Sequence, residues 1–577
     1  MCGIFALING NSSNGDSSNG DSLNGDSLNG ELIEELFMLG KERGPENFKF
    51  FDNYKNMNIS IGFHRLAING LNEISNQPIV IDNILLICNG EIYNYKQLFD
   101  SHHFKQTTNS DCEIIIHMYM KYGMNQMLKL LHGVFAFILI DYRDYENLDL
   151  FKVFSARDTY GIRPMFYLEK NNGTLGFSSE LKQLSPLYAS NEGDIIKQFP
   201  PGHVKQFDYY KDKKTNLKLV FSSLTNFKYD SYNHWTSFEL YNKHPTSHDI
   251  QYNLYNINKY LKQAVEYRVH NTDRPVACLL SGGLDSSLIT ALVAKHYKNP
   301  NQLETYSIGL KDAEDLKYAR KVAEYIGTNH HEIIVSEDDF FNAIPEVINT
   351  IESYDTTTVR ASVGNYLIGK YISEHSNAKV IFNGDGSDEL TGGYLYMHHA
   401  PTNEDFDMEC RRLLDNIHYF DVLRSDRCIS THGLEPRTPF LDTIFTRYYL
   451  SISERIRNHT NGNLPEKYLL RKAFSQEKIL PNEVLWRTKE AFSDGVSSEK
   501  NSWHTIIKRK IMELEENSIE NLGSLPEITL EQKYYKKIFQ SKFGNVEHVI
   551  PYYWMPKFID SDDCSARNLS IYNRLNE

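Results

Sequence analysis

Long hydrophobic runs are missing from this 577-residue sequence. A membrane-spanning helix needs about 20 consecutive apolar residues, and no run approaches that length. The first residues also lack a charged segment followed by a long apolar stretch with a cleavage site, so we expect no presequence. We therefore expect a soluble, cytoplasmic protein.

The sequence is also poor in paired cysteines and in net positive charge. Its seven cysteines are scattered, odd in number and without a Cys-x-x-Cys pair, which argues against a disulfide framework and a zinc ribbon and favours a reducing compartment. Lysine and arginine number 61 against 75 acidic residues, for a net charge of −14. This balance argues against nucleic acid or an anionic membrane as the main partner.

The chain contains two regions that differ in their pattern of apolar residues. Residues 2–205 contain mostly short apolar runs with turn signals and one clear helix at 111–122, which predicts packed antiparallel sheets with helices outside. Residues 251–577 begin with alternating strands and helices, the pattern of a parallel sheet with helices on both faces. Residues 206–250 show no strong periodicity, so we interpret them as a connection between two domains.

A five-residue repeat of the Asn-Gly-Asp-Ser type spans residues 11–30. Such units favour turns and bury almost nothing. We predict a flexible surface insertion within the first domain, without a role in chemistry.

Cys2 is the most informative single residue. If Met1 is removed, Cys2 carries a thiol and a free α-amine, and an amine of pKa about 7.7 to 8.0 can accept the thiol proton near neutral pH. A lone cysteine is more often a small buried hydrophobe. A catalytic role for Cys2 therefore needs support from the remainder of the sequence.

A glycine-rich turn follows the predicted strand at 275–280 and precedes a predicted helix that starts near Ser286. Glycines let the backbone approach a ligand closely, and the exposed N–H groups at a helix start favour phosphate. The spacing is neither that of the dinucleotide fingerprint nor that of the Walker loop. It is similar to the pyrophosphate loop of ATP-cleaving synthetases that form an adenylate. The turn reads Ser281-Gly282-Gly283-Leu284-Asp285-Ser286-Ser287.

A second polar run, Asn383-Gly384-Asp385-Gly386-Ser387-Asp388-Glu389, follows the short apolar strand at 380–382. Acidic residues after a strand belong at the carboxyl edge of a parallel sheet, where ligands bind in such folds. Solvated acidic turns are common, but beside the first loop we expect Asp285 and Asp388 to share a Mg²⁺ ion that neutralises charge on leaving pyrophosphate.

The two regions together resemble the glutamine-dependent asparagine synthetases over nearly the whole chain. The motifs that carry the resemblance are, in chain order, His64-Arg65-Leu66-Ala67-Ile68, Asn89-Gly90-Glu91-Ile92-Tyr93-Asn94, Ser110-Asp111-Cys112-Glu113, Gly133-Val134-Phe135-Ala136-Phe137, Arg157-Asp158, Ser281 to Ser287, Tyr354 to Ser362, Asn383 to Glu389, Arg437 to Asp442 and Lys489 to Gly495. The resemblance implies an αββα sandwich of the N-terminal-nucleophile, class II glutamine amidotransferase type, followed by an α/β doubly wound synthetase domain of the ATP-pyrophosphatase type.

For the first domain the resemblance implies that Cys2 attacks the carboxamide of glutamine. Asn89 and the Gly90 amide would stabilise the oxyanion, a contribution commonly worth about 3 to 4 kcal/mol per donor. Arg65 would pair with the substrate α-carboxylate. Taken alone, Arg65 also fits a surface ion pair, and Asn89-Gly90 fits a hairpin turn. The residues implied to bind glutamine are Arg65, Leu66, Ala67, Ile68, Asn69, Asn89, Gly90, Glu91 and Asp111.

For the second domain it implies that aspartate attacks the α-phosphate of ATP to form β-aspartyl-AMP, from which ammonia displaces AMP. Lys489 would act on the charge that develops on phosphate, and Asp385 would assist formation of the intermediate. Thr357, Thr358 and Arg360 would bind aspartate, with Arg360 as a carboxylate or phosphate partner. The residues implied to bind ATP are Leu279, Ser281, Gly282, Gly283, Asp285, Ser286, Ile308, Asn383 and Gly384.

One motif departs from the family pattern. Where the family usually has Ser-Gly-Glu-Gly-Ser-Asp-Glu, this chain has Asn383 and Asp385. The carboxylate expected to help form the intermediate is therefore one methylene shorter, and we expect a lower rate of intermediate formation.

Two other interpretations are disfavoured. A β-lactam-forming synthetase on the same scaffold needs no glutaminase, whereas this chain has Cys2, Arg65, Asn89 and Asp111. An inactive storage or regulatory protein would not need the nucleophile, the metal carboxylates and Lys489. A homodimer is left open.

Overall fold

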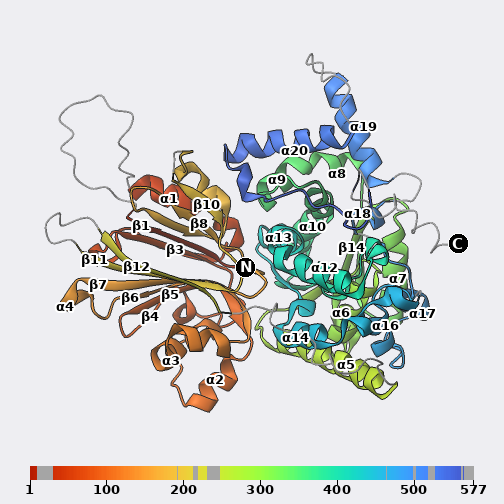
Figure 1. Ribbon diagram of the computed structural model, residues 1–577, viewed down its shortest axis with the longest axis horizontal. Helices are drawn as coiled ribbons and strands as arrows, with labels where there is room; N and C mark the ends of the chain where they lie inside the picture. The colour runs from red at the N-terminus through yellow and green to blue at the C-terminus, as the bar shows by residue number, and fades with distance from the viewer. Residues whose placement is uncertain are drawn as a thin grey trace. The chain divides into compact units, whose positions relative to one another are not determined.

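Figure 1 shows the computed structural model, in which the chain divides into two compact units. One unit comprises Met1–Ser231 and Gln540–Val549, and the other comprises Tyr232–Phe539 and Ile550–Glu577. Apart from Gly30, the predicted insertion at 11–30 lies outside the described residues. The structure describes residues 1–9, 30–190, 193–211, 219–229, 247–462, 464–490, 492–497, 502–516, 527–560 and 563.

The first unit contains two six-stranded sheets whose strand pairs are all antiparallel. One sheet has the order β10-β8-β9-β1-β3-β2 and the other β12-β11-β7-β6-β5-β4. The strands are β1 (Gly3–Ile8), β2 (Asn47–Phe51), β3 (Ile59–Arg65), β4 (Ile79–Ile81), β5 (Ile84–Ile92), β6 (Gly133–Asp141), β7 (Leu150–Arg157), β8 (Phe166–Glu169), β9 (Leu175–Ser178), β10 (Ile195–Gln198), β11 (His203–Lys211) and β12 (Leu219–Lys228). The helices are α1 (Gly30–Met38), α2 (Tyr95–His102), α3 (Ile114–Leu130) and α4 (Tyr145–Leu148).

Four layers result from the way these elements bury their apolar faces. One core cluster joins Ile4 and Ala6 of β1 to Leu85 and Ile87 of β5, so the two sheets pack face to face. A second cluster joins the other face of β5 to helices α2 and α3. On the outer face of the first sheet, Phe37 of α1 covers β3. The predicted αββα sandwich is thus confirmed.

The start of the predicted connection at 206–250 needs correction. β11 pairs with β7, and β12 pairs with β11, so the second sheet extends to Lys228. The register of the β11–β12 pair shifts between Asp208 and Tyr209, which breaks the alternation that would have indicated a strand. β12 is also the edge strand of its sheet. The residues between 230 and 246 lie outside the described part of the chain.

The second unit is built on one five-stranded parallel sheet of order β15-β14-β13-β16-β17. From β13 the chain adds β14 and β15 on one side, then returns to add β16 and β17 on the other. The carboxyl ends of strands beside such a reversal form a crevice for ligands. The strands are β13 (Val276–Leu279), β14 (Glu304–Leu310), β15 (Asn329–Val335), β16 (Val380–Phe382) and β17 (Glu435–Arg437).

Helices cover both faces of this sheet. Ile308 of β14 lies against Gly364 of α10, whereas Gly309, the next residue, lies against Leu316 of α7. Because successive strand residues point to opposite faces, α10 and α7 lie on opposite sides, and the predicted doubly wound α/β fold is confirmed. The helices are α5 (Ser247–His270), α6 (Leu284–Ala294), α7 (Glu314–Ile326), α8 (Glu337–Asn342), α9 (Ile344–Ile351), α10 (Thr356–His375), α11 (Ser387–Thr391), α12 (Asn403–Asn416), α13 (Asp421–Ser430), α14 (Thr443–Ser451), α15 (Glu454–Arg457), α16 (Tyr468–Phe474), α17 (Asn482–Leu485), α18 (Phe492–Gly495), α19 (Trp503–Glu516) and α20 (Glu527–Phe543).

No helix in the described part of the chain combines the length and the apolar character needed to cross a membrane.

Candidate active sites

Cys2 lies immediately before β1, at the end of a central strand pair of the first unit. Gly3 pairs with His64 of β3, which brings Cys2 beside the residues that follow β3. The Cys2 Sγ lies 3.5 Å from the carbonyl oxygen of Leu66, and Arg43 Nε donates to the Cys2 carbonyl at 3.1 Å. One contact thus holds the thiol of Cys2 and the other holds its backbone.

Asn89 and Gly90 lie inside the nine-residue strand β5, so the hairpin-turn alternative is wrong. A Cβ at Gly90 would lie 2.4 Å from the carbonyl oxygen of Val134, which only glycine tolerates on this crowded strand. Asn89 is 1% exposed, and both polar atoms of its side-chain amide lack a hydrogen-bond partner among the described residues. A buried amide without partners is costly unless a ligand satisfies it, so Asn89 has the character expected of an oxyanion donor.

Arg65 ends β3 and is buried, which excludes the surface ion pair. Its Nη1 donates to Asn76 Oδ1 at 2.6 Å and to the Asn72 carbonyl at 3.1 Å, and its Nη2 donates to the carbonyls of Asn69 and Gly70. These four acceptors orient the guanidinium.

Two carboxylates that were predicted to bind glutamine, those of Glu91 and Asp111, are also buried in this unit. Asn69 Nδ2 donates to Glu91 Oε2 at 2.5 Å, and the Ile92 amide donates to Asp111 Oδ2 at 2.6 Å. The predicted glutamine-binding residues Leu66, Ala67 and Ile68 form the buried segment after β3.

In the second unit, the predicted phosphate loop closes on itself after β13. Ser281 Oγ and Ser286 Oγ lie 3.0 Å apart, and the Gly283 amide donates to Ser281 Oγ at 3.3 Å. Gly282 has φ +77, and a Cβ there would lie 2.4 Å from the amide nitrogen of Ala319. The loop therefore needs glycine at this position for both its conformation and its packing.

The acidic loop after β16 lies directly against the phosphate loop. A Cβ at Gly384 would lie 2.7 Å from Asp285 Cβ, and Ser387 Oγ donates to Asp285 Oδ1 at 2.7 Å. The two loops follow the neighbouring strands β13 and β16, so their proximity results from the sheet order. The predicted meeting of the two motifs is thus seen in the structure.

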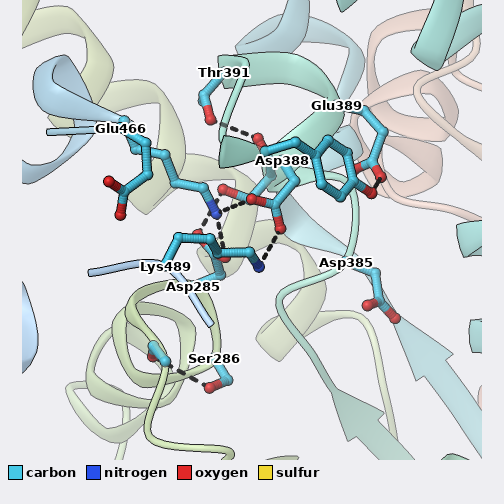
Figure 2. Close-up of polar contacts among 12 residues, drawn as sticks. Asp285, Ser286, Asp385, Asp388, Glu389, Thr391, Glu466 and Lys489 are labelled. Carbon is cyan, nitrogen blue, oxygen red and sulfur yellow. Dashed lines mark hydrogen bonds and ion pairs between the residues drawn. The ribbon is translucent and has the colours of Figure 1, made fainter. Parts of the chain in front are cut away.

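Two lysines join the acidic side chains of these loops. Lys467 pairs with Asp285 and lies 2.6 Å from Asp388 Oδ1, and Lys489 Nζ lies 2.7 Å from Asp388 Oδ2. Figure 2 shows Asp285, Asp388 and Lys489 turned toward one another. Burial opposes ionisation of Asp388, but the two ammonium groups hold its pKa below the usual range. Burial likewise opposes the charged form of Lys489, whose pKa is nevertheless held above its usual range by Asp388 and Asp285.

Asp385 lies apart from this cluster, as Figure 2 shows. Its Oδ1 accepts from Arg424 Nη2 at 3.2 Å, and the same nitrogen donates to Asp421 Oδ1 at 2.7 Å. Burial raises the pKa of Asp385, and Arg424 acts in the opposite direction. The shorter carboxylate is therefore anchored to one guanidinium that it shares with Asp421.

A cavity of about 180 Å³ opens at the carboxyl ends of β13, β14 and β16. Its walls include the two loops, both lysines, and Thr357 and Thr358 at the start of α10. Gly282, which was also predicted to bind ATP, is outside the lining. The other predicted ATP-binding residues all line the cavity: Leu279, Ser281, Gly283, Asp285, Ser286, Ile308, Asn383 and Gly384.

Arg360 is placed differently from its prediction as a substrate partner. It is outside the cavity lining, and its guanidinium pairs with Glu531 at 2.6 Å and with Asp563 at 2.9 Å. Arg360 lies one helical turn beyond the first residue of α10. The start of this helix lines the cavity, but the Arg360 side chain points to Glu531 and Asp563 instead. We assign it a structural role.

Several residues that line the cavity were not predicted from the sequence. Lys467 has a left-handed backbone conformation with φ +60 just before α16, and it carried no motif of its own. Arg424, Tyr394 and Trp554 line the cavity from segments that show only ordinary amphipathic or aromatic patterning. Lys467 and Trp554 come from segments far along the chain, for which local sequence gives no signal, whereas Tyr394 follows the acidic loop by five residues.

The two carboxylates fit the expected Mg²⁺ ion. Mg²⁺ prefers oxygen ligands and is usually held by one or two carboxylates together with substrate phosphates. Among the described residues, no group of three or more His, Cys, Asp or Glu side chains could hold a metal by itself. Asp285 and Asp388 would therefore supply the protein's share of the ligands, and ATP the phosphate oxygens.

Comparison with known proteins assigns the family. Residues 1–226 match the family model of the glutamine amidotransferase domain, and residues 256–408 and 400–544 match that of asparagine synthase. The chain is 42% identical over 546 residues to asparagine synthetase (glutamine-hydrolyzing) of Gallus gallus, covering 92% of this chain and 94% of that protein. This chain belongs to the glutamine-hydrolysing asparagine synthetase family.

Identity to the family member of Homo sapiens is 41% over 546 residues, again with 92% of this chain and 94% of that protein covered. A solved structure of glutamine phosphoribosylpyrophosphate amidotransferase from B. subtilis covers 53% of this chain and 66% of that chain at 17% identity, with a TM-score of 0.28, which is too distant to carry an argument. Membership of the family confirms the resemblance found in the sequence, whereas the roles of individual residues remain predictions.

Proposed function

We propose that this protein synthesises asparagine from aspartate, glutamine and ATP. The observation that carries the proposal is a cavity in the second unit, where a phosphate loop, an acidic loop and two lysines converge at the carboxyl ends of parallel strands. The glutamine amidotransferase domain of the family supports a glutaminase role for the first unit, which contains Cys2 and an Asn89 side-chain amide without a hydrogen-bond partner among the described residues.

In the first reaction Cys2, once Met1 is removed, transfers its thiol proton to its own α-amine and attacks the carboxamide of glutamine. Asn89 and the Gly90 amide donate hydrogen bonds to the resulting oxyanion. Ammonia leaves, and water hydrolyses the thioester to glutamate and restores the thiol. Arg65 holds the substrate α-carboxylate while Glu91 and Asp111 face its α-ammonium.

In the second reaction the β-carboxylate of aspartate attacks the α-phosphorus of ATP and pyrophosphate leaves. Lys467 and Lys489 exchange their carboxylate partners for phosphate oxygens, and a Mg²⁺ ion on Asp285 and Asp388 would neutralise charge on the leaving pyrophosphate. Ammonia then attacks the β-carbonyl carbon and AMP leaves. Thr357 and Thr358 form the aspartate side of the cavity, and Asp385 assists formation of the intermediate.

Pyrophosphate release with ATP, Mg²⁺ and ammonia tests this function directly. We expect release only when aspartate is present, with asparagine formed in equal amount. Release that does not depend on aspartate would overturn the assignment. Intact-mass measurement of the purified chain provides the second test, since a retained Met1 would leave Cys2 without its α-amine.

We further propose that the protein is cytoplasmic, in keeping with its scattered cysteines, of which the six in the described part of the chain are free thiols. A homodimer is the assembly to test first, by measuring the mass of the native particle in solution.

A further inference from the structure

The chain returns to the cavity of the second unit through its C-terminal segment. We call residues 550–560 together with Asp563 the C-terminal strap. The Trp554 amide donates to Asp355 Oδ1 at 2.7 Å, and Thr357 Oγ1 donates to the Trp554 carbonyl at 3.3 Å. Asp355 also caps α10 through a 2.8 Å bond from the Thr358 amide. One buried carboxylate thus fixes both the strap and the start of α10.

Trp554 lines the cavity, and its indole packs beside another lining residue, Tyr394. Its side chain is 6% exposed, and its ring centroid lies 5.3 Å from that of Tyr394 and 6.1 Å from that of Tyr396. Tyr394 and Phe420 line the cavity beside it, next to the start of α10. An aromatic wall therefore closes the side of the cavity where we place the amino-acid substrate.

Further contacts hold the strap along its length. Arg360 binds Asp563 through two hydrogen bonds of 3.0 and 2.9 Å. This arginine, which does not line the cavity, therefore anchors the strap. Tyr553 packs against Tyr354 with ring centroids 5.6 Å apart, and its side chain does not line the cavity. The strap is thus anchored on both sides of Trp554.

We propose that Trp554 is a wall residue that protects the acyl-adenylate from water and so determines which nucleophile takes it. The proposal rests on the proposed function. Water attack on the β-carbonyl carbon would form a new C–O bond, break the bond to AMP and release a proton, which regenerates aspartate and wastes one ATP as AMP and pyrophosphate. Closed sites suppress such side reactions by excluding water.

The test measures pyrophosphate and asparagine together in the full-length protein, with ATP, Mg²⁺, aspartate and a fixed ammonia concentration. For Trp554→Leu we expect the ratio of pyrophosphate to asparagine to rise roughly threefold or more over the parent protein, because water gains access to the intermediate. Trp554→Phe, with a smaller ring, should give an intermediate ratio. Tyr553→Leu is the matched control: it removes a neighbouring aromatic ring from the same strap and should leave the ratio unchanged.

An unchanged ratio of pyrophosphate to asparagine in folded Trp554→Leu would overturn the proposal. An equal rise of this ratio in Tyr553→Leu would also overturn it, because the ratio would then depend on how well the strap is ordered and not on the Trp554 ring. If Trp554→Leu does not fold, Trp554→Phe decides by the same measurement, and an unchanged ratio there overturns the proposal. A parent protein that releases no pyrophosphate with aspartate present would defeat the proposed function instead, so the two failures are distinguishable.

Discussion

The two candidate sites are held together by different forces. Around Cys2, backbone carbonyls accept hydrogen bonds from Arg65, and the Asn89 side-chain amide has no hydrogen-bond partner in the described chain. In the second unit, charges of opposite sign bind one another, with Lys467 and Lys489 on Asp285 and Asp388. The first site is prepared for its substrate, whereas the second must replace its own ion pairs.

This difference has an energetic reason. A hydrogen-bond donor aimed at a developing oxyanion acts best when it is already oriented and has no competing acceptor. Lys467 is buried and the other three charged groups are half-buried, so these charges need partners, because desolvation of an isolated charge costs several kcal/mol. A site that binds a polyphosphate therefore needs acids to balance its lysines until the substrate arrives.

Cys2→Ala makes the sharpest separation of the two sites. We expect glutamine-dependent synthesis to fall to the detection limit, because no other nucleophile can form the thioester. Ammonia-dependent synthesis should be unchanged, since the described residues that line the adenylation cavity all belong to the second unit. Both rates are measured as asparagine formed in the same preparation. Loss of both in a folded variant would contradict the separation.

Asp285→Asn should produce the reverse pattern. Synthesis with ammonia is expected to fall by about 10³-fold, because the change removes one expected metal ligand and one partner of Lys467. Glutamine hydrolysis, measured as glutamate released, serves as the internal control and should continue. Synthesis at the parental rate would refute the role assigned to Asp285.

Asn89→Ala tests the unpartnered amide of the first site. Removal of one oxyanion donor commonly lowers kcat by about 10²- to 10³-fold, and we expect this range for glutamine hydrolysis with little change in KM. Ammonia-dependent synthesis is the control. A fall below about tenfold would mean that the Asn89 side chain does not reach the oxyanion.

The sequence predicted most where chemistry is local. The phosphate loop and the acidic loop each follow one strand, and the spacing of their residues placed them at one sheet edge before the contact between Gly384 and Asp285 was seen. The strands β11 and β12 were missed because a register shift at Asp208 hides their alternation.

Residues that complete the second site from a distance were beyond local patterns. Lys467 reaches Asp285 across 182 positions of sequence, and Trp554 reaches Asp355 across 199. The error at Arg360 has a related cause. Thr357, Thr358 and Arg360 are close in sequence, but helical rotation turns the arginine toward Glu531 and Asp563 while the threonines line the cavity.

Asp385→Glu should have the smallest effect and sharpens the comparison within the charged site. The change restores the longer carboxylate usual in the family, so we expect kcat for ammonia-dependent synthesis to rise by about two- to tenfold through better positioning. Glutamine hydrolysis should not change, and the KM for aspartate should move little. In the structure Asp385 shares Arg424 with Asp421, and a longer side chain keeps that partner while extending further from the backbone. A lower kcat would mean that the acidic loop after β16 is matched to the shorter side chain of Asp385. The replacement of the usual glutamate by Asp385 would then be an adaptation of this chain that does not reduce the rate.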